Sequence, residues 1–252
     1  MNIHKVIDWK DKFKDSPLII VGPGPSFDSA PEPFFDLAPV FCLNHTITHF
    51  FQRPDHWWVS NDHDRTFQNL SLKIEIQNRL QAYACWRTIT NRKFIPGEFG
   101  DIDWIDHRGN PQKPTSWRMP CPEESSIWWY HENEGFDGHV RNGQSVLELA
   151  LEVATIWNFS PIILVGIDLE LINRGSGKEP IYYAKPWRWK ETPRRVLKGH
   201  KLSDIKISIE KNRERWTDEI YHTSEYATRL PFEHVTFKQA EDIIKCEEWK
   251  ES

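Results

Sequence analysis

The chain has 252 residues, a formal net charge of -5 and 38% hydrophobic residues, enough for one large α/β domain. The acidic balance argues against a general nucleic-acid binder, which normally carries a basic face. No apolar stretch is long enough to cross a bilayer, and the charged N-terminus lacks a signal-peptide core, so we expect a cytoplasmic protein with no transmembrane segment. The four cysteines have no spacing typical of a zinc cluster or a disulfide framework.

The first distinctive feature is an apolar run that ends in glycine and proline. Residues 18–22 are predicted to form a buried strand, and Gly22-Pro23-Gly24-Pro25-Ser26 is predicted to form a tight loop after it. Glycine lets the backbone come close to another group, and a helix start after the loop would offer free N–H groups to an anion. An ordinary strand-to-helix turn explains the same residues. The loop is not the dinucleotide-binding fingerprint, because the third glycine of that motif is absent.

Polar residues also follow the next two predicted strands, at 39–44 and 55–61. Asn44 ends the first of them and Asn61 the second. In parallel α/β sheets the carboxyl ends of the strands line the ligand site. The three strand ends therefore predict one ligand site, although both asparagines can instead serve only to close turns.

The rest of the chain reads as further α/β elements. Apolar spacing predicts a helix over 146–154, with Gln144 and Ser145 at its cap. A buried parallel strand at 161–168 ends in Asp168. The other expected segments are a helix at 66–81, a strand within 82–90, a long loop or inserted subdomain at 95–139, a lid at 172–200, a helix at 203–216, a strand at 219–222 and a last helix near 237–249. We predict a single Rossmann-like α/β domain over 1–252, with a mostly parallel sheet and a lid subdomain.

These segments, in this order, resemble the bacterial single-domain sialyltransferases of glycosyltransferase family 42. The resemblance rests on "IIVGPGPSF", "FCLNH", "VSN", "RNGQSVLELALEVA", "PIILVGIDLEL", "IYYA" and "GHKLSDIKISIE", and it is weakest at 65–135. It extends to motility-associated glycosyltransferases and hydroxymethylpterin pyrophosphokinase-like proteins, which share the Gly-Pro-Ser loop and the "PIILVG-D" strand. The chain departs from the family pattern at His45, at Gln144-Ser145 and at Glu170.

The resemblance implies an inverting glycosyltransferase that transfers a sugar from a nucleotide-sugar donor to a hydroxyl of a glycan acceptor. CMP-sialic acid or a related CMP-sugar is the favoured donor. The implied donor-binding residues are Gly22, Gly24, Pro25, Ser26, Asn44, Asn61, Gln144, Ser145 and Asp168.

The same resemblance implies three catalytic residues. Tyr182 and Tyr183 of the lid would donate to the leaving phosphate, and Tyr183 matches the family position better. His200, in "GHKLSDIK", matches the family's general base. Histidine suits this role because it accepts a proton near neutral pH.

Two other classes of function stay open. Asp62 and Asp64 at a predicted strand end suit Mg²⁺ or Mn²⁺ holding a diphosphate, which would favour a metal-dependent pyrophosphokinase-like phosphotransferase. A solvated turn explains the same two residues. The third class is a non-catalytic module that binds a nucleotide or glycan. The favoured function needs no metal or other cofactor, its partners are the donor and the acceptor rather than nucleic acid, and formation of a homo-oligomer is left open.

Overall fold

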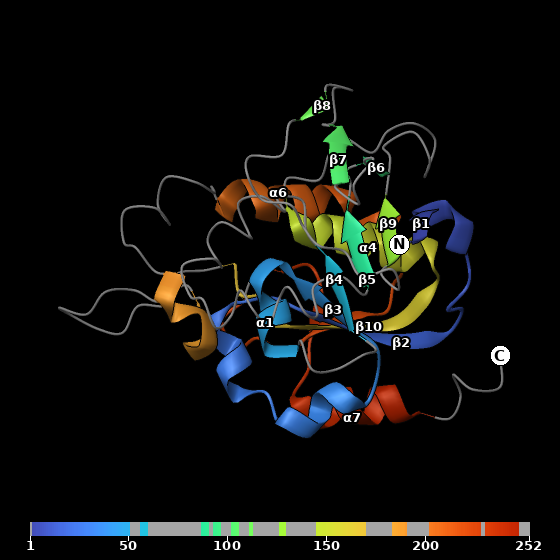
Figure 1. Cartoon of the computed structure of the whole chain (residues 1–252). Coiled ribbons are helices and arrows are strands. Elements are labelled where there is room, and N and C mark those ends of the chain that lie inside the picture. The colour runs from blue at the N-terminus through green and yellow to red at the C-terminus, as the bar shows by residue number, and fades with distance from the viewer. Residues whose placement is uncertain are drawn as a thin grey trace.

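The computed structural model describes residues 2–50, 56–59, 87–90, 93–96, 102–105, 111–112, 126–129, 145–169, 183–190, 202–227 and 230–246. Their centre is a nine-stranded sheet in which each neighbouring pair of strands is parallel (Figure 1). In spatial order the strands are β1 (Asn2–Lys5), β9 (Ser126–Trp129), β5 (Arg87–Thr90), β4 (His56–Val59), β3 (Val40–Leu43), β2 (Ser16–Val21), β10 (Phe159–Val165), β11 (Ile220–His222) and β12 (Glu233–His234). The predicted α/β fold with a mostly parallel sheet is confirmed.

The strand order reverses between β2 and β10. From β2 the chain builds β3 and β4 outward on one side, and it later returns to place β10, β11 and β12 on the other side. The six strands from β4 to β12 thus have the 3-2-1-4-5-6 order of doubly wound sheets. Such sheets bind ligands beyond the carboxyl ends of the strands at the reversal point. We call this side of the sheet the carboxyl edge.

Helices cover both faces of the sheet. The α-helices among the described residues are α1 (Ile47–Phe50), α4 (Val146–Ile156), α6 (Leu202–Asn212) and α7 (Phe237–Lys245). The short 3₁₀ helices are η1 (Val6–Trp9), η2 (Pro25–Ser29), η3 (Glu32–Asp36), η4 (Asn44–Thr46), η5 (Lys185–Lys190) and η6 (Arg213–Arg215). In Figure 1, α4 and α6 lie together on one side of the strands and α7 lies on the other. None of the described helices is long and apolar enough to cross a membrane.

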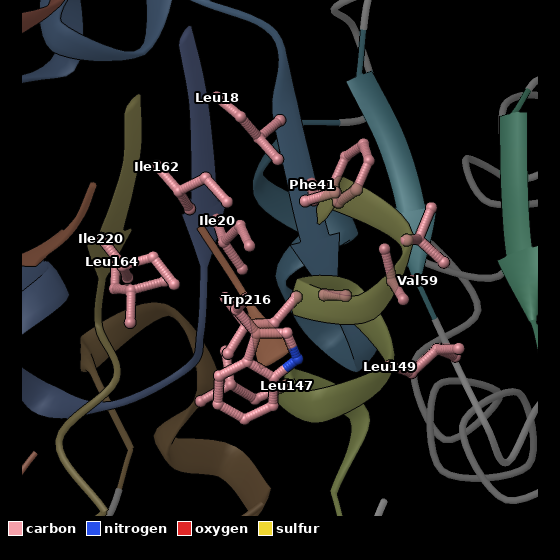
Figure 2. Close-up of a cluster of buried hydrophobic side chains, with 14 of the residues drawn as sticks. Leu18, Ile20, Phe41, Val59, Leu147, Leu149, Ile162, Leu164, Trp216 and Ile220 are labelled. Carbon is pink, nitrogen blue, oxygen red and sulfur yellow. The ribbon is translucent and has the colours of Figure 1, made fainter. Parts of the chain in front are cut away.

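Successive residues of β2 point into two different apolar layers. Leu18 and Ile20 pack in the layer that contains side chains of α4 and α6 (Figure 2). Ile19 and Val21 pack in the layer that contains side chains of α7. This alternation is the period of two that any strand imposes, and burial on both faces explains why the strand reads as a continuous apolar run.

Helix α6 runs alongside α4 in the same direction. The hydroxyl of Ser208 donates to the Glu148 carboxylate, in the first turn of α4. One turn later in α4, the two oxygens of Glu152 accept hydrogen bonds from Arg215 and Trp216, which follow the end of α6, each over 3.1 Å. Because α4 leads into the parallel strand β10, it begins at the carboxyl edge, and α6 therefore begins there too.

The region predicted as a long loop or subdomain contributes to two sheets. Strands β6 (Lys93–Pro96), β7 (Ile102–Ile105) and β8 (Pro111–Gln112) form a small antiparallel sheet. Strand β9 instead joins the main sheet between β1 and β5. The sequence did not predict β1 or β9, because each has only four residues and neither forms a long apolar run. The predicted helix at 66–81 and most of the predicted lid lie outside the described residues.

Two histidines face each other near the carboxyl ends of β11 and β12. His222 and His234 are register partners, and their ring centroids lie 5.2 Å apart. His222 is buried, whereas His234 is exposed. Burial lowers the pKa of His222, and the neighbouring His234 lowers it further.

Acidification should therefore destabilise the protein through His222. Because the pKa of His222 is lower in the folded state, the unfolded chain binds the proton more readily. This contribution to stability is complete above the unfolded value of about 6.5 and is lost as the pH falls towards the folded pKa. Urea unfolding across this range should show a smaller acid loss for His222→Gln than for the wild type. His234→Gln should also show a smaller acid loss than the wild type, but the difference should be smaller than for His222→Gln, because burial is the larger cause of the lowered pKa. Parallel pH profiles of the wild type and His222→Gln would contradict the assignment to His222.

Candidate functional site

The Gly22–Ser26 loop packs directly on Gly166–Asp168, the turn that follows β10. The N–H of Gly22 donates to the Val165 carbonyl and that of Gly24 to the Gly166 carbonyl, each over 2.8 Å. A Cβ on Gly24 would lie 2.4 Å from Oδ2 of Asp168 and 2.6 Å from the Gly166 oxygen. Gly24 has an ordinary φ of −70°, so glycine is needed there for space rather than for conformation. The group that approaches the glycine backbone is therefore the turn after β10.

The carboxylate of Asp168 joins the ends of three strands. Its Oδ2 accepts the Ser26 N–H over 2.8 Å, and its Oδ1 accepts the Ser224 hydroxyl. The Ser224 oxygen in turn accepts the N–H groups of Tyr226 and Ala227. Asp168 is 2% exposed, so these bonds form in a buried setting. The carboxylate therefore has a structural role. A contact between Asp168 and a donor stays a prediction.

The backbone N–H groups of the loop all donate within the protein. Besides the bonds from Gly22, Gly24 and Ser26, the N–H of Phe27 donates to the Gly24 carbonyl over 3.1 Å. Pro23 and Pro25 have no N–H. The loop leads into the short 3₁₀ helix η2. The expectation that a helix start would offer free N–H groups to an anion is therefore wrong for Gly22 to Phe27, because the loop and the turn after β10 use them.

One buried polar side chain beside this junction has no hydrogen-bond partner among the described residues. It is the hydroxyl of Ser26, and Ser26 is 3% exposed. Asn44, which follows β3, is only half-buried. An unpaired buried polar group costs roughly 1–3 kcal/mol, so such a group calls for an explanation such as a bound ligand or water.

Asn44 also has a purely structural role. Its φ of +51° is left-handed, which asparagine tolerates better than most residues. Its carbonyl accepts Nε1–H of Trp58 over 2.8 Å, which ties the end of β3 to β4. The backbone of Asn44 thus closes the turn after β3, and a contact of its side chain with a donor stays a prediction.

Neighbouring segments hold this junction from both sides. The Thr46 hydroxyl lies 3.2 Å from the Val21 carbonyl and 3.1 Å from the Leu43 carbonyl, and so fixes the turn after β3 against the end of β2. On the other side, the N–H of Ala184 donates to the Pro23 carbonyl over 2.8 Å. Tyr183 is therefore attached next to the Gly22–Ser26 loop, on the chain segment in which the sequence predicts a lid.

Ser145 caps α4 as the sequence predicted. Its hydroxyl accepts the Glu148 N–H over 3.3 Å, and the Glu148 carboxylate accepts the Ser145 N–H over 3.0 Å. This reciprocal pair is a capping box. Ser145 thus lies at the carboxyl edge, where α4 begins, with its hydroxyl already bonded within the cap.

The other predicted site residues lie outside the described part of the chain: Asn61, Asp62, Asp64, Gln144, Tyr182 and His200. Within the described part, no group of three histidine, cysteine or acidic residues could hold a metal ion. The sequence interpretation missed Ser224 and the turn that it holds. The signal was present, because "TSE" follows the strand predicted at 219–222 and is a polar ending like those of the earlier strands.

No protein-family model, curated protein or solved structure matches this chain.

Gly24→Ala should destabilise the protein by about 1–3 kcal/mol, because the new methyl group must displace Asp168 or the Gly166 carbonyl. Urea unfolding measures the loss. In an Asp168→Ala background the same substitution should cost less, because one of the two obstructing groups is absent. Equal costs in both backgrounds would show that the carboxylate is not an obstacle, and no cost in either would contradict the close packing.

Proposed function

We propose that this protein is an inverting glycosyltransferase that uses a CMP-linked sugar donor and a hydroxyl of a glycan acceptor. The observation that supports it best is the buried, unpartnered hydroxyl of Ser26 at the carboxyl edge, beside the point where the strand order reverses, with the half-buried Asn44 at the end of the next strand, β3. A carboxamide and a hydroxyl each offer both donors and acceptors. A cytosine edge and sugar hydroxyls require both.

The proposal assigns the phosphate of the donor to side chains rather than to the glycine loop. The N–H groups from Gly22 to Phe27 are bonded within the protein, and the buried carboxylate of Asp168 repels an anion at the junction. Tyr183 is attached next to the loop through the Ala184–Pro23 hydrogen bond. A tyrosine hydroxyl aimed at the leaving phosphate would stabilise the charge that develops as the glycosidic bond breaks. Tyr182 is the other candidate from the resemblance.

His200 is the proposed general base. It lies outside the described residues, and its support is the direction of the helix that follows it. Helix α6 begins at Leu202 on the carboxyl-edge side of the molecule. The partial positive charge of a helix N-terminus favours the neutral imidazole, which is the form that accepts a proton from the acceptor hydroxyl.

CMP should raise the melting temperature more than UDP, GDP or ATP, and a chelator should not change its effect, because a ligand that binds the folded state stabilises it. Asn44→Gly should weaken CMP binding roughly tenfold, since it removes the carboxamide but tolerates the left-handed backbone. Asn158→Gly is the matched control: Asn158 is also left-handed, with φ +65°, but precedes β10 at the opposite edge of the sheet. A larger shift with ATP or UDP that a chelator abolishes would favour the metal-dependent phosphotransferase instead.

His200→Ala should reduce sugar transfer from CMP-sialic acid to oligosaccharide acceptors by roughly a hundred- to ten-thousandfold, the usual range for a lost general base. CMP binding should survive, because the base contacts the acceptor hydroxyl. The exposed His234→Gln serves as the control histidine in both assays. Near-normal transfer by His200→Ala would rule out this assignment.

A further inference from the structure

An exposed aromatic side chain stands at the carboxyl edge. Tyr226 is 42% exposed and Ile207 is 48% exposed, and these are the exposed large hydrophobic side chains of the described residues. Ile207 lies in the middle of α6, whereas Tyr226 follows the end of β11, in the turn Ser224–Ala227. A scattered exposed apolar residue such as Ile207 needs no explanation, but an exposed ring at the carboxyl edge, one strand from the point where the strand order reverses, lies on the side where such sheets bind ligands.

Hydrogen bonds attach this turn to the residues of the candidate site. The N–H groups of Tyr226 and Ala227 donate to the Ser224 oxygen over 3.2 and 3.1 Å. The Ser224 hydroxyl donates to Asp168, and the other oxygen of Asp168 accepts the Ser26 N–H. A short chain of hydrogen bonds thus connects the backbone of Tyr226 to Ser26, whose hydroxyl has no partner among the described residues.

The base of the turn is buried while its tip is exposed. Ser224 and Ala227 are 2% and 1% exposed, so both ends of the turn that carries Tyr226 are buried. The neighbouring Glu225 is exposed and acidic, and Asp168 lies beneath the turn. Two carboxylates disfavour a phosphate here, so an uncharged ring is the part of a nucleotide that suits this turn.

We propose that the Ser224–Ala227 turn forms a further wall of the donor site and that the ring of Tyr226 packs on the nucleoside half of the donor. This inference rests on the proposed function and adds to it a residue that the resemblance did not indicate. Ring packing of this kind discriminates between nucleosides and simple phosphates, because it needs a ring face and no charge. The phosphate is then left to the lid side of the junction.

Calorimetric titration with CMP, cytidine and inorganic phosphate tests this arrangement. Tyr226→Ala should weaken CMP and cytidine binding by a similar factor, on the order of tenfold, and leave any phosphate binding unchanged. Tyr226→Phe should bind nearly as the wild type does, since the ring is kept. Ile207→Ala is the matched control, because it removes a similarly exposed apolar side chain from α6. All three variants should keep the melting temperature of the free protein, as their side chains are exposed.

The outcomes separate this inference from the proposed function. If the wild type binds CMP and Tyr226→Ala binds it equally well, Tyr226 is not part of the site, while the proposed function stands. If Tyr226→Ala loses affinity for inorganic phosphate as strongly as for cytidine, the ring contact is wrong and the turn acts on the phosphate. If the wild type binds neither CMP nor cytidine, the proposed function fails and the donor wall fails with it.

Discussion

The buried carboxylate of Asp168 holds the carboxyl edge of this protein together. One oxygen binds the backbone of Ser26 after β2, and the other binds Ser224 after β11, while Asp168 itself follows β10. A buried carboxyl group is costly unless hydrogen bonds compensate its burial, so the three strand ends must keep this arrangement. Gly24 completes the constraint, because any larger residue would push the carboxylate away.

This constraint decides which groups can meet a ligand. The backbone N–H groups of the glycine loop donate hydrogen bonds to the end of β10 and the turn after it. In the phosphate-binding loops of dinucleotide enzymes, by contrast, such groups donate to the phosphate. Recognition is left to the side chains that surround the junction. Ser26 and Asn44 provide polar groups on one side, Tyr183 belongs to the segment bonded to Pro23, and Tyr226 is presented by the turn that Ser224 holds.

The layer of helices above the sheet supports the same edge. The Glu148 carboxylate closes the cap of α4 and also accepts the Ser208 hydroxyl, so the beginning of α4 and the body of α6 are joined by one side chain. Glu152 repeats the connection one turn later, with Arg215 and Trp216. Helix α6 is thereby held in a fixed direction, with its first residue, Leu202, on the carboxyl-edge side.

Local patterns in the sequence determined the fold class, the central strands and the cap at Ser145. Each of these depends on neighbours along the chain: the run of buried residues in β2 and β10, the helical spacing of α4, and a serine three residues before a glutamate. The tertiary structure alone decided that β1 and β9 pair at the far side of the sheet, because four residues gain their stability only from a partner distant in sequence. It also decided the role of the glycines and of Asp168. Contacts between residues 24 and 168, or 168 and 224, depend on how the parallel strands come together. The residues next to each of them in the sequence do not indicate which distant residue it contacts.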